Sequence, residues 1–260
     1  MIVPERRESI VKKLSRVMVV VAVLLLCLVG PAVARAQEPW YSALVPDAVG
    51  TRVTSFWLLD HSRDKNHFLG SIDELHARQD YLPYKVFLDW DLGRYAFVDL
   101  TWDKISADAQ SRHGRDDTDG IVDMGGPILT VNLRYPNKTP LTPYAGIGIA
   151  PWSATFDHAS WHEYGFSSVA AWEAAGKPDH SINGKTRPII LDDSVGFVAA
   201  AGLGYALTGH WSLDLYGRYV NISTDYTYSV YVNGKHRAGG SGSFPLSNIA
   251  AGLGVNYSFL

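Results

Sequence analysis

The sequence of 260 residues contains a single cysteine, Cys27, which lies near the N-terminus. The chain after it therefore has no disulfide framework. No stretch after residue 36 has 18 uninterrupted apolar residues, which excludes an ordinary membrane-spanning helix there. Positive charge is not in surplus either, since 23 Lys and Arg stand against 26 Asp and Glu. A nucleic acid is therefore not an expected partner.

Residues 1–36 have the three parts of a secretory signal peptide. The stretch "MIVPERRESIVKKLSR" is basic, residues 17–29 form an apolar run, and "ARA" at 34–36 supplies small residues for cleavage. The apolar run is short for a membrane-spanning helix, although an uncleaved anchor is the alternative. We expect the mature chain to begin at Gln37. Removing six Lys and Arg and two Asp and Glu then leaves 17 against 24, a formal charge of −7.

Aromatic residues are abundant, with 14 Tyr, 8 Trp and 9 Phe, and several segments alternate with a period of two. In "NIAAGLGVNYSFL" at 248–260, Leu253 and Val255 alternate with Gly252 and Gly254. Successive side chains of a strand point to opposite faces, so one face is apolar and the other small or polar. A secreted chain with this pattern is either a soluble periplasmic β-protein or a barrel in an outer membrane.

The stretch "AGIGI" at 145–149 has close copies, "AGLGY" at 201–205 and "AGLGV" at 251–255. A dinucleotide-binding loop needs a third glycine three residues on and a helix after it. Pro, Leu and Tyr occupy those positions, and no helical pattern follows. The glycines fall on the non-apolar strand face instead. Glycine in a strand marks close approach or a bend, so we expect these residues to face the lumen of a narrow barrel.

The spacing predicts an all-β fold, an eight-stranded antiparallel up-and-down transmembrane β-barrel over residues 51–260, preceded by a periplasmic segment at 37–50. Short links alternate strictly with long links, as periplasmic turns alternate with extracellular loops in outer-membrane barrels. We therefore expect localisation in the outer membrane, with both ends of the mature chain on the periplasmic side. The strands are expected near residues 51–61, 81–91, 94–105, 123–135, 141–154, 191–207, 211–227 and 244–260, with long links near 62–80, 106–122, 155–190 and 228–243.

The inward strand faces are expected to carry charges of both signs and some large apolar side chains. Unpaired burial of a charge is costly, so the charges should pair, and Asp214 and Arg218 are expected to pair with each other. An eight-stranded barrel is only wide enough for its own side chains, which makes a wide pore unlikely. The predicted charged residues are Lys85, Asp89, Asp99, Arg134, Asp214 and Arg218, and the predicted apolar lining is Phe56, Leu58, Phe87, Phe97, Tyr144 and Trp152.

Residues 126–260 resemble the OmpW family of small outer-membrane barrels. The resemblance lies in the order of "PILTVNLRY", "TPYAGIGIAPW", "LDDSVGFVAAAGLGYAL", "WSLDLYGRYVNISTDYTY" and "GLGVNYSF". It implies an eight-stranded barrel with a partly apolar interior that passes small hydrophobic molecules. Two departures are notable: Val195 stands where the family often has Trp, a role that Trp152 could take, and Leu260 follows Phe259 at the end of the strand that assembly machinery would read.

Two other functions are open. A lipid A-modifying hydrolase would use a His-x-Ser pair, and His158-Ala159-Ser160 with Glu163 nearby is such a pair, although Trp161 follows where that family has Asn. The other match, at 210–212, lies in a short periplasmic turn. A structural or adhesive barrel would instead present its loops to a partner.

The sequence predicts no catalytic site, metal or cofactor. His158 and His162 have the spacing of zinc ligands on a helix, but the HExxH pattern is absent. Residues 167–177 are expected to form a short helix in the longest external loop. The expected partners are outer-membrane lipid, lipopolysaccharide, the outer-membrane assembly machinery through the C-terminal strand, and small hydrophobic solutes.

Overall fold

The computed structural model describes residues 44–60, 72–79, 84–111 and 118–259, and the predicted signal peptide, the segment at 37–43 and Leu260 lie outside them. Eight antiparallel strands close into a barrel, because each strand pairs with its neighbour and β1 pairs with both β3 and β13. The predicted fold class is confirmed. The barrel strands are β1 (Ala48–Leu58), β3 (Tyr84–Asp91), β4 (Ala96–Ser111), β5 (Thr118–Arg134), β6 (Leu141–His158), β9 (Ser194–Ala206), β10 (Trp211–Asn221) and β13 (Asn248–Ser258).

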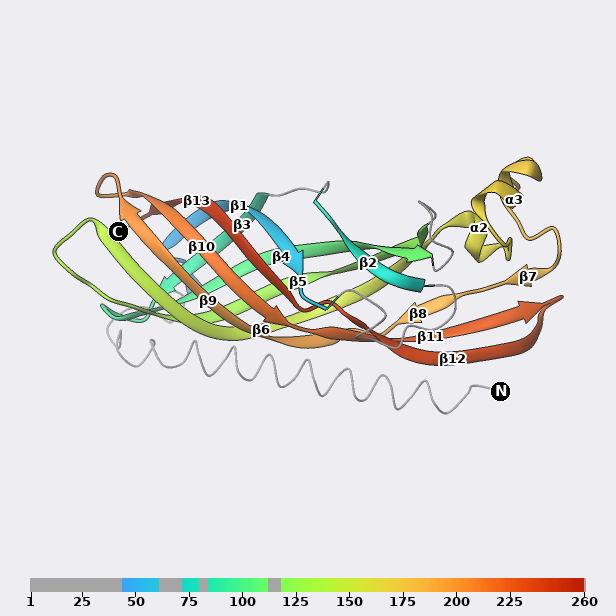
Figure 1. The fold of residues 1–260 in the computed structure, drawn as a ribbon. Coiled ribbons are helices and arrows are strands. Elements are labelled where there is room, and N and C mark those ends of the chain that lie inside the picture. The colour runs from blue at the N-terminus through green and yellow to red at the C-terminus, as the bar shows by residue number, and fades with distance from the viewer. Residues whose placement is uncertain (1–43, 61–71, 80–83, 112–117, 260) are drawn as a thin grey trace.

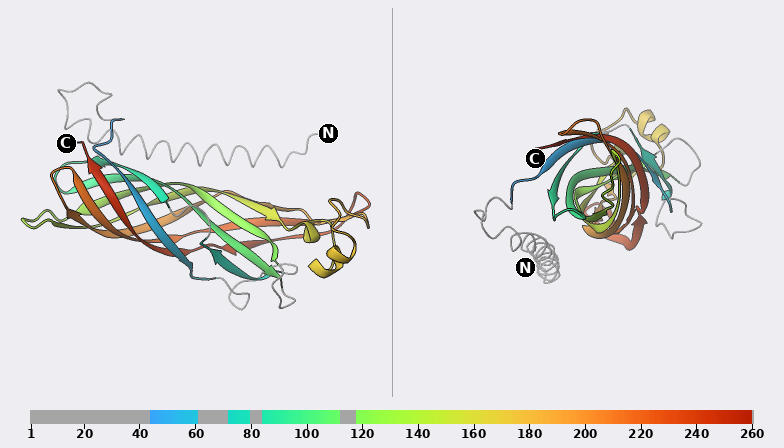
Figure 2. Two further views of the ribbon diagram at one scale, coloured as in Figure 1. Left: turned by 90° about the horizontal axis from the view of Figure 1, so that it is seen from above. Right: turned by 90° about the vertical axis from the view of Figure 1, so that its left-hand side faces the viewer.

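The barrel continues beyond its closed part into an external extension, at the end opposite to the C-terminus (Figures 1 and 2). There, β2 (Ile72–Arg78) pairs with the far end of β4. A second sheet contains β7 (Lys185–Thr186), β8 (Ile189–Leu191), β11 (Ser223–Val232) and β12 (Lys235–Pro245).

The prediction of a long link at 228–243 is wrong, because β11 and β12 form a hairpin there. Asn233 and Gly234 both have positive φ, at 50° and 72°. This is the turn geometry that an Asn-Gly pair favours between two strands. Two further predicted boundaries also shift: β4 and β5 run into the expected link at 106–122, and β1 begins three residues before 51. The external ends of these strands are therefore longer than the sequence pattern predicts.

Two short helices, α2 (Ser160–Glu163) and α3 (Val169–Ala174), lie in the longest external connection. The Ser168 hydroxyl accepts a hydrogen bond from the Ala171 amide at 3.2 Å, which caps the start of α3. The predicted short helix over 167–177 is therefore confirmed. Neither helix, nor any other in the described part of the chain, has the length and apolar character needed to cross a membrane.

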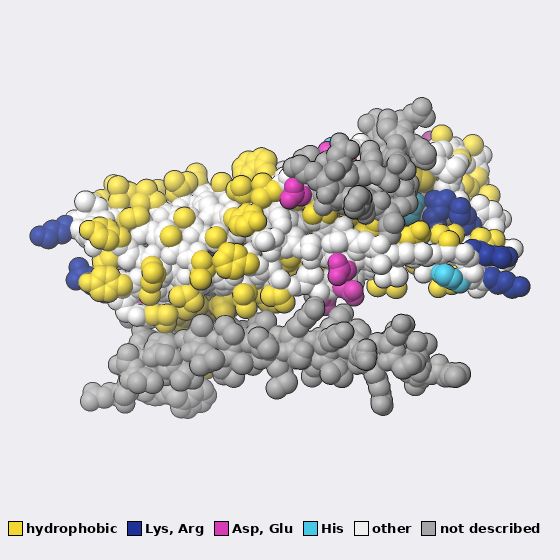
Figure 3. Space-filling model, turned by 60° about the horizontal axis from the view of Figure 1, so that its bottom comes forward, with side chains coloured by type: hydrophobic (Ala, Val, Ile, Leu, Met, Phe, Trp, Pro, Cys, Tyr) yellow, Lys and Arg dark blue, Asp and Glu magenta, His cyan; other side chains and the backbone are white. Residues whose placement is uncertain are grey.

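The barrel wall has an apolar outer face and a different inner face, as the alternation predicts. Leu253 is 66% exposed and Val255 is also exposed, whereas Gly254 is buried. Figure 3 shows hydrophobic side chains spread over the closed part of the barrel on the face in view, with Lys and Arg at both ends of the molecule and more of them, together with His, at the tip of the external extension. A band of hydrophobic side chains, with aromatic residues at its borders, is the lipid-contacting surface of an outer-membrane barrel.

Two of the repeated glycines make room for large lumen side chains. A Cβ atom on Gly254 would lie 2.8 Å from Arg52 Cγ, and one on Gly202 would lie 2.6 Å from Tyr144 Cε1. Real Cβ atoms do not approach other atoms this closely, so a larger residue would displace Arg52 or Tyr144. Gly202 and Gly254 thus serve lumen packing, as expected.

Candidate functional site

The inner, periplasmic half of the lumen is built around Arg52, which the sequence reasoning did not select. Its Nη1 and Nε atoms each lie 2.7 Å from a carboxylate oxygen, of Asp99 and of Asp214 respectively. The guanidinium group also lies over the Phe87 ring, 3.7 Å from its centroid, and over the Tyr216 ring at 4.2 Å. All these groups are buried. The alternation of Arg52, Thr54 and Phe56 in β1 was the signal for an inward Arg52.

A second group of charges, which is also buried, involves Lys85, Asp103 and Arg218. Lys85 Nζ lies 2.5 Å from Asp103 Oδ1, and Arg218 forms an ion pair with the other oxygen of the same carboxylate. The Arg218 guanidinium lies 5.8 Å from the centroid of the Trp152 ring. One carboxylate thus holds two cations next to an aromatic side chain.

The predicted pair of Asp214 and Arg218 is wrong, because Asp214 pairs with Arg52 and Arg218 pairs with Asp103. The two residues share the inward face of β10, but a strand rises about 3.3 Å per residue. A spacing of four residues therefore separates them by about 13 Å. That spacing brings side chains together on a helix, not on a strand.

Asp89 and Arg134 lie at the periplasmic end of the lumen. Arg134 Nη2 lies 2.8 Å from Asp91 Oδ1, so Arg134 pairs with an acid that is not among the six charged residues predicted above. Asp89 Oδ2 accepts a long hydrogen bond of 3.4 Å from the Asn256 side chain. These residues line a cavity of about 240 Å³, with charged and aromatic side chains in its wall, which we call the vestibule.

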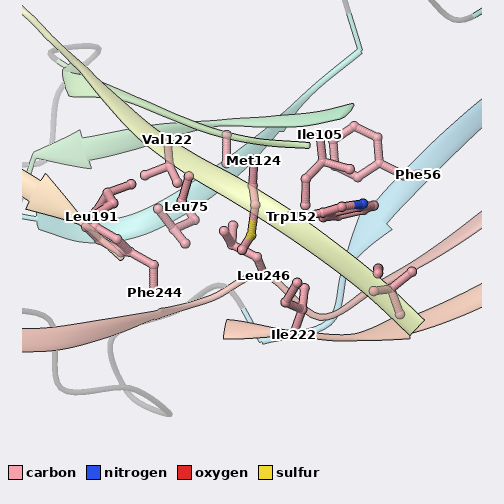
Figure 4. Close-up of a cluster of buried hydrophobic side chains, with 14 of the residues drawn as sticks. Phe56, Leu75, Ile105, Val122, Met124, Trp152, Leu191, Ile222, Phe244 and Leu246 are labelled. Atoms are coloured by element: carbon pink, nitrogen blue, oxygen red, sulfur yellow. The ribbon is translucent and has the colours of Figure 1, made fainter. Parts of the chain in front are cut away.

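The outer half of the lumen is filled by an apolar cluster that extends into the external extension (Figure 4). Trp152 is 1% exposed and packs in the same cluster as Phe56, with Leu58 at its margin. Further members are Leu75, Ile105, Val122, Met124, Ile128, Leu191, Val198, Val220, Ile222, Phe244 and Leu246. This half contains large aliphatic and aromatic side chains in place of ion pairs.

Only half of the predicted apolar lining lies in this cluster. Phe87 stacks below Arg52, and the Phe97 ring lies 5.6 Å from the Arg134 guanidinium. The Tyr144 hydroxyl donates a hydrogen bond of 2.7 Å to Asp214. These three rings therefore belong to the charged inner half. Sequence alternation gives the face of a side chain, but it does not give its height relative to residues on other strands.

The barrel wall has an interrupted ladder between β5 and β6, next to the apolar cluster. Pairing stops between Gly125↔Ser153 and Leu129↔Ile149. The register places Pro127 opposite Pro151 in this gap. Further along the same ladder, the Tyr135 amide donates to the Pro143 carbonyl. Every second facing pair of an antiparallel ladder exchanges such hydrogen bonds, so the position of Pro127 and Pro151 is one where each residue would donate to the other. Both of these hydrogen bonds are missing, because proline has no N–H.

We call residues 126–128 and 150–152 the seam. The other edge of β5 remains paired there, with Pro127 opposite Trp102, and β6 remains paired to β9, with Pro151 opposite Val195. Proline within a sheet is normally confined to edges and bulges. The stretches "GGPIL" and "IAPWS" carried this signal in the sequence.

The residues considered for hydrolysis lie in the external extension and the periplasmic turn. His158 Nε2 accepts a hydrogen bond of 2.8 Å from the Ile189 amide, so this nitrogen is turned to the backbone. His162 Nε2 lies 3.9 Å from Asp119 Oδ2, and Ser160 is exposed at the start of α2. His210 contacts the Ser258 carbonyl at 3.0 Å.

Comparisons with known proteins agree on the architecture. The family model described as outer membrane protein beta-barrel domain matches residues 20–259. The crystal structure of the outer membrane protein OprG from Pseudomonas aeruginosa aligns with a TM-score of 0.55 and 14% identity, over 83% of this chain and 96% of that one. The outer membrane protein AlkL, solved in DMPC lipid bilayers, aligns with a TM-score of 0.54 and 20% identity, over 83% and 90%.

The solution structure of the E. coli outer membrane protein W aligns with a TM-score of 0.48 and 15% identity, over 83% and 98% of the two chains. No curated protein matches the sequence. At these identities, the solved structures support the fold alone.

Proposed function

Because this chain belongs to the family of outer-membrane protein β-barrel domains and lies in the outer membrane, we propose that it is a narrow channel for small hydrophobic molecules. The expected family type and location are thereby confirmed, whereas the solute is part of the proposal. In this account, solutes enter the outer half of the lumen from outside and leave sideways through the seam.

The observation that carries the proposal is the division of the lumen into an apolar half and a charged half. Apolar solutes gain about 25 cal/mol per Å² of surface removed from water, so the cluster around Phe56 and Trp152 can hold them. Passage onward to the periplasm would separate the ion pairs of Arg52 and Asp103. Breaking a buried ion pair costs about 3–5 kcal/mol.

The seam offers a route that leaves these ion pairs intact. Trp152 lies directly after Pro151, and its side chain belongs to the apolar cluster on the inner side of the wall. On the outer side of the wall, Trp102 of β4 pairs opposite Pro127, and its side chain is 67% exposed. Exposed Trp marks the border of the lipid-contacting band in such barrels. A solute that parts the seam would therefore reach the outer leaflet at its surface.

The test is uptake of a small apolar fluorescent probe by liposomes that contain the purified barrel and a trapped cyclodextrin. We expect uptake above that of protein-free liposomes, with sucrose excluded. The double variant Pro127→Ala/Pro151→Ala restores two N–H donors to the ladder, so it should slow uptake several-fold. Pro143→Ala is the matched control, because Pro143 also lies in β6 but near its periplasmic end.

The same preparations should be assayed for hydrolysis of lipid A acyl chains. Ser160→Ala should leave probe uptake unchanged, because Ser160 lies on α2 outside the lumen cluster. If probe uptake equals that of protein-free liposomes and Ser160→Ala abolishes a hydrolase activity, the channel proposal is wrong and the enzyme takes its place.

A further inference from the structure

The vestibule is a cavity with charged and aromatic side chains at the periplasmic end of the barrel, and the buried ion pairs separate it from the apolar cluster. Its rim includes Ala48, Ala206 and Ser258, which lie at or near strand ends on the periplasmic side. Arg52 and its carboxylate partners form its inner wall. The cavity of about 240 Å³ therefore lies between the periplasmic strand ends and the ion pairs of Arg52.

The charges that line the vestibule do not balance. Leaving aside Asp47, whose Oδ2 atom accepts a hydrogen bond from the Asp91 amide, three carboxylates, of Asp89, Asp91 and Asp214, face two guanidinium groups, of Arg52 and Arg134. Arg52 is shared with Asp99, which lies beyond the cavity wall. Arg134 pairs with Asp91 and also donates to the Gly93 and Arg94 carbonyls. Negative charge therefore exceeds positive charge in this chamber.

The excess is centred on Asp89, whose side chain forms part of the cavity wall. Asp89 is 8% exposed, so it is more than nine-tenths buried. Its Oδ1 atom has no hydrogen-bond partner, and Oδ2 has only the 3.4 Å contact with Asn256. The Asn256 side-chain oxygen also lacks a partner. A buried carboxylate that pairs with no cation is costly, and a bound donor of positive charge would remove this cost.

We propose that the vestibule binds a small organic cation that carries N–H donors, such as a primary amine or a guanidine, at Asp89. A charged N–H donor satisfies a carboxylate with a charge-assisted hydrogen bond, and the Asn256 oxygen can accept another. Phe87, Phe97 and Tyr144 supply aromatic surface for the carbon skeleton. Binding here needs no passage through the barrel, so it is independent of the proposed channel.

The dimensions and the ligand set restrict the cation. A volume of 240 Å³ equals that of about eight water molecules in the liquid, which suits a molecule of under about ten heavy atoms. Among the described residues, no group of three or more His, Cys, Asp or Glu has the arrangement of a metal site. An organic amine is therefore favoured over a divalent metal.

The experiment is a titration of the ¹⁵N-labelled full mature chain in neutral detergent with 1,4-diaminobutane, followed by amide shifts. 1,4-Butanediol is the uncharged analogue, tetramethylammonium is a cation without N–H donors, and Mg²⁺ represents divalent metals. We expect saturable shifts at Gly204, Ser212 and Asn256 with the diamine only. Removing a hydrogen bond to a charged group weakens binding by about tenfold or more, which is the expected effect of Asp89→Asn.

Two control variants locate the effect. Asp157→Asn removes an exposed carboxylate of the external extension, and Trp152→Ala perturbs the apolar cluster; neither should change the affinity for the diamine. The proposal is overturned if butanediol, tetramethylammonium or Mg²⁺ produces the same shifts, or if Asp89→Asn binds as the parent does. The absence of any shift, as expected if Asp89 holds a proton in place of a cation, also overturns it. These comparisons among ligands in the parent protein remain decisive if Asp89→Asn does not fold.

Discussion

The two halves of the lumen are both filled by side chains, but the side chains differ in kind. The inner half fills a narrow tube with ion pairs, in which Arg52 and Asp103 each hold two partners of opposite charge. The outer half fills it with apolar side chains around Phe56 and Trp152. The wall around both halves has the same alternation, so the alternation alone does not distinguish a barrier to apolar molecules from a site that accepts them.

The difference between the two halves is tested most strongly by neutralising Asp103, the carboxylate that two cations share in the inner half. Asp103→Asn leaves Lys85 and Arg218 buried without their common partner, and we expect a loss of about 3–5 kcal/mol in the free energy of unfolding. Asp123→Asn is the control, because its ion pair with Lys104 is partly exposed and should contribute under about 1 kcal/mol. Urea unfolding in detergent measures both, and equal losses would contradict the account.

The distinction between the inner and outer wall faces is tested at adjacent positions of β13. Leu253→Arg places a charge in the lipid band and should cost about 2–4 kcal/mol near the midplane. Single cysteines at 252, 253, 254 and 255 should react with a bilayer-restricted reagent only at the odd positions, where the side chains are exposed. Equal labelling at all four positions would rule out the two-face arrangement.

The role of glycine in the inner half is tested by two neighbouring residues of β9. A methyl group at Gly202 would collide with Tyr144, whereas one at Gly204 would meet only the Thr142 carbonyl at 3.7 Å, an ordinary contact. Gly202→Ala should therefore cost about 1–3 kcal/mol, as overpacking does, and displace the hydrogen bond from Tyr144 to Asp214. Thermal unfolding should rank Gly202→Ala well below Gly204→Ala, and the reverse order would be unexpected.

A further prediction concerns the external extension, where burial and then the nearby Arg187 lower the pKa of His162 to about 3 from 6.5. The folded state therefore keeps His162 neutral, and its stability is complete above pH 6.5 and declines as the pH falls towards 3. The loss is about 1.4 kcal/mol per pH unit in this window. The protection factors of the amides at residues 160–164, which correct for the slower intrinsic exchange at lower pH, should fall between pH 7 and pH 5, and His162→Gln should remove this fall if the fold tolerates it.

The fold was predictable from the sequence because it rests on local rules. Alternation assigns Leu253 outward and Gly254 inward, and turn spacing gives the number and direction of the strands. The hairpin of β11 and β12 was missed although Asn233-Gly234 is a strong turn signal. A long link was expected there because short strands are enough to cross the membrane. In the structure, the strands instead continue beyond the membrane-spanning part of the barrel as β11 and β12.

The candidate site was predictable only in part because its partners come from different strands. The inward charges were identified, but their pairing depends on strand tilt and register, which place Arg52 of β1 against Asp99 of β4 and Asp214 of β10. The same limit explains why Phe87, Phe97 and Tyr144 were grouped with Trp152. The seam needs two prolines to be opposite each other, which also depends on register.

Stapling the seam tests the central claim most directly. Leu129 and Ile149 are paired just below it, and facing residues at such sites lie about 5.5 Å apart at Cα, a suitable separation for a disulfide. Leu129→Cys/Ile149→Cys should abolish uptake of the apolar probe when oxidised and recover it when reduced. Ser55→Cys/Ala251→Cys, at an equivalent pair between β1 and β13, should leave uptake unchanged. Full uptake through the oxidised seam variant would contradict sideways release.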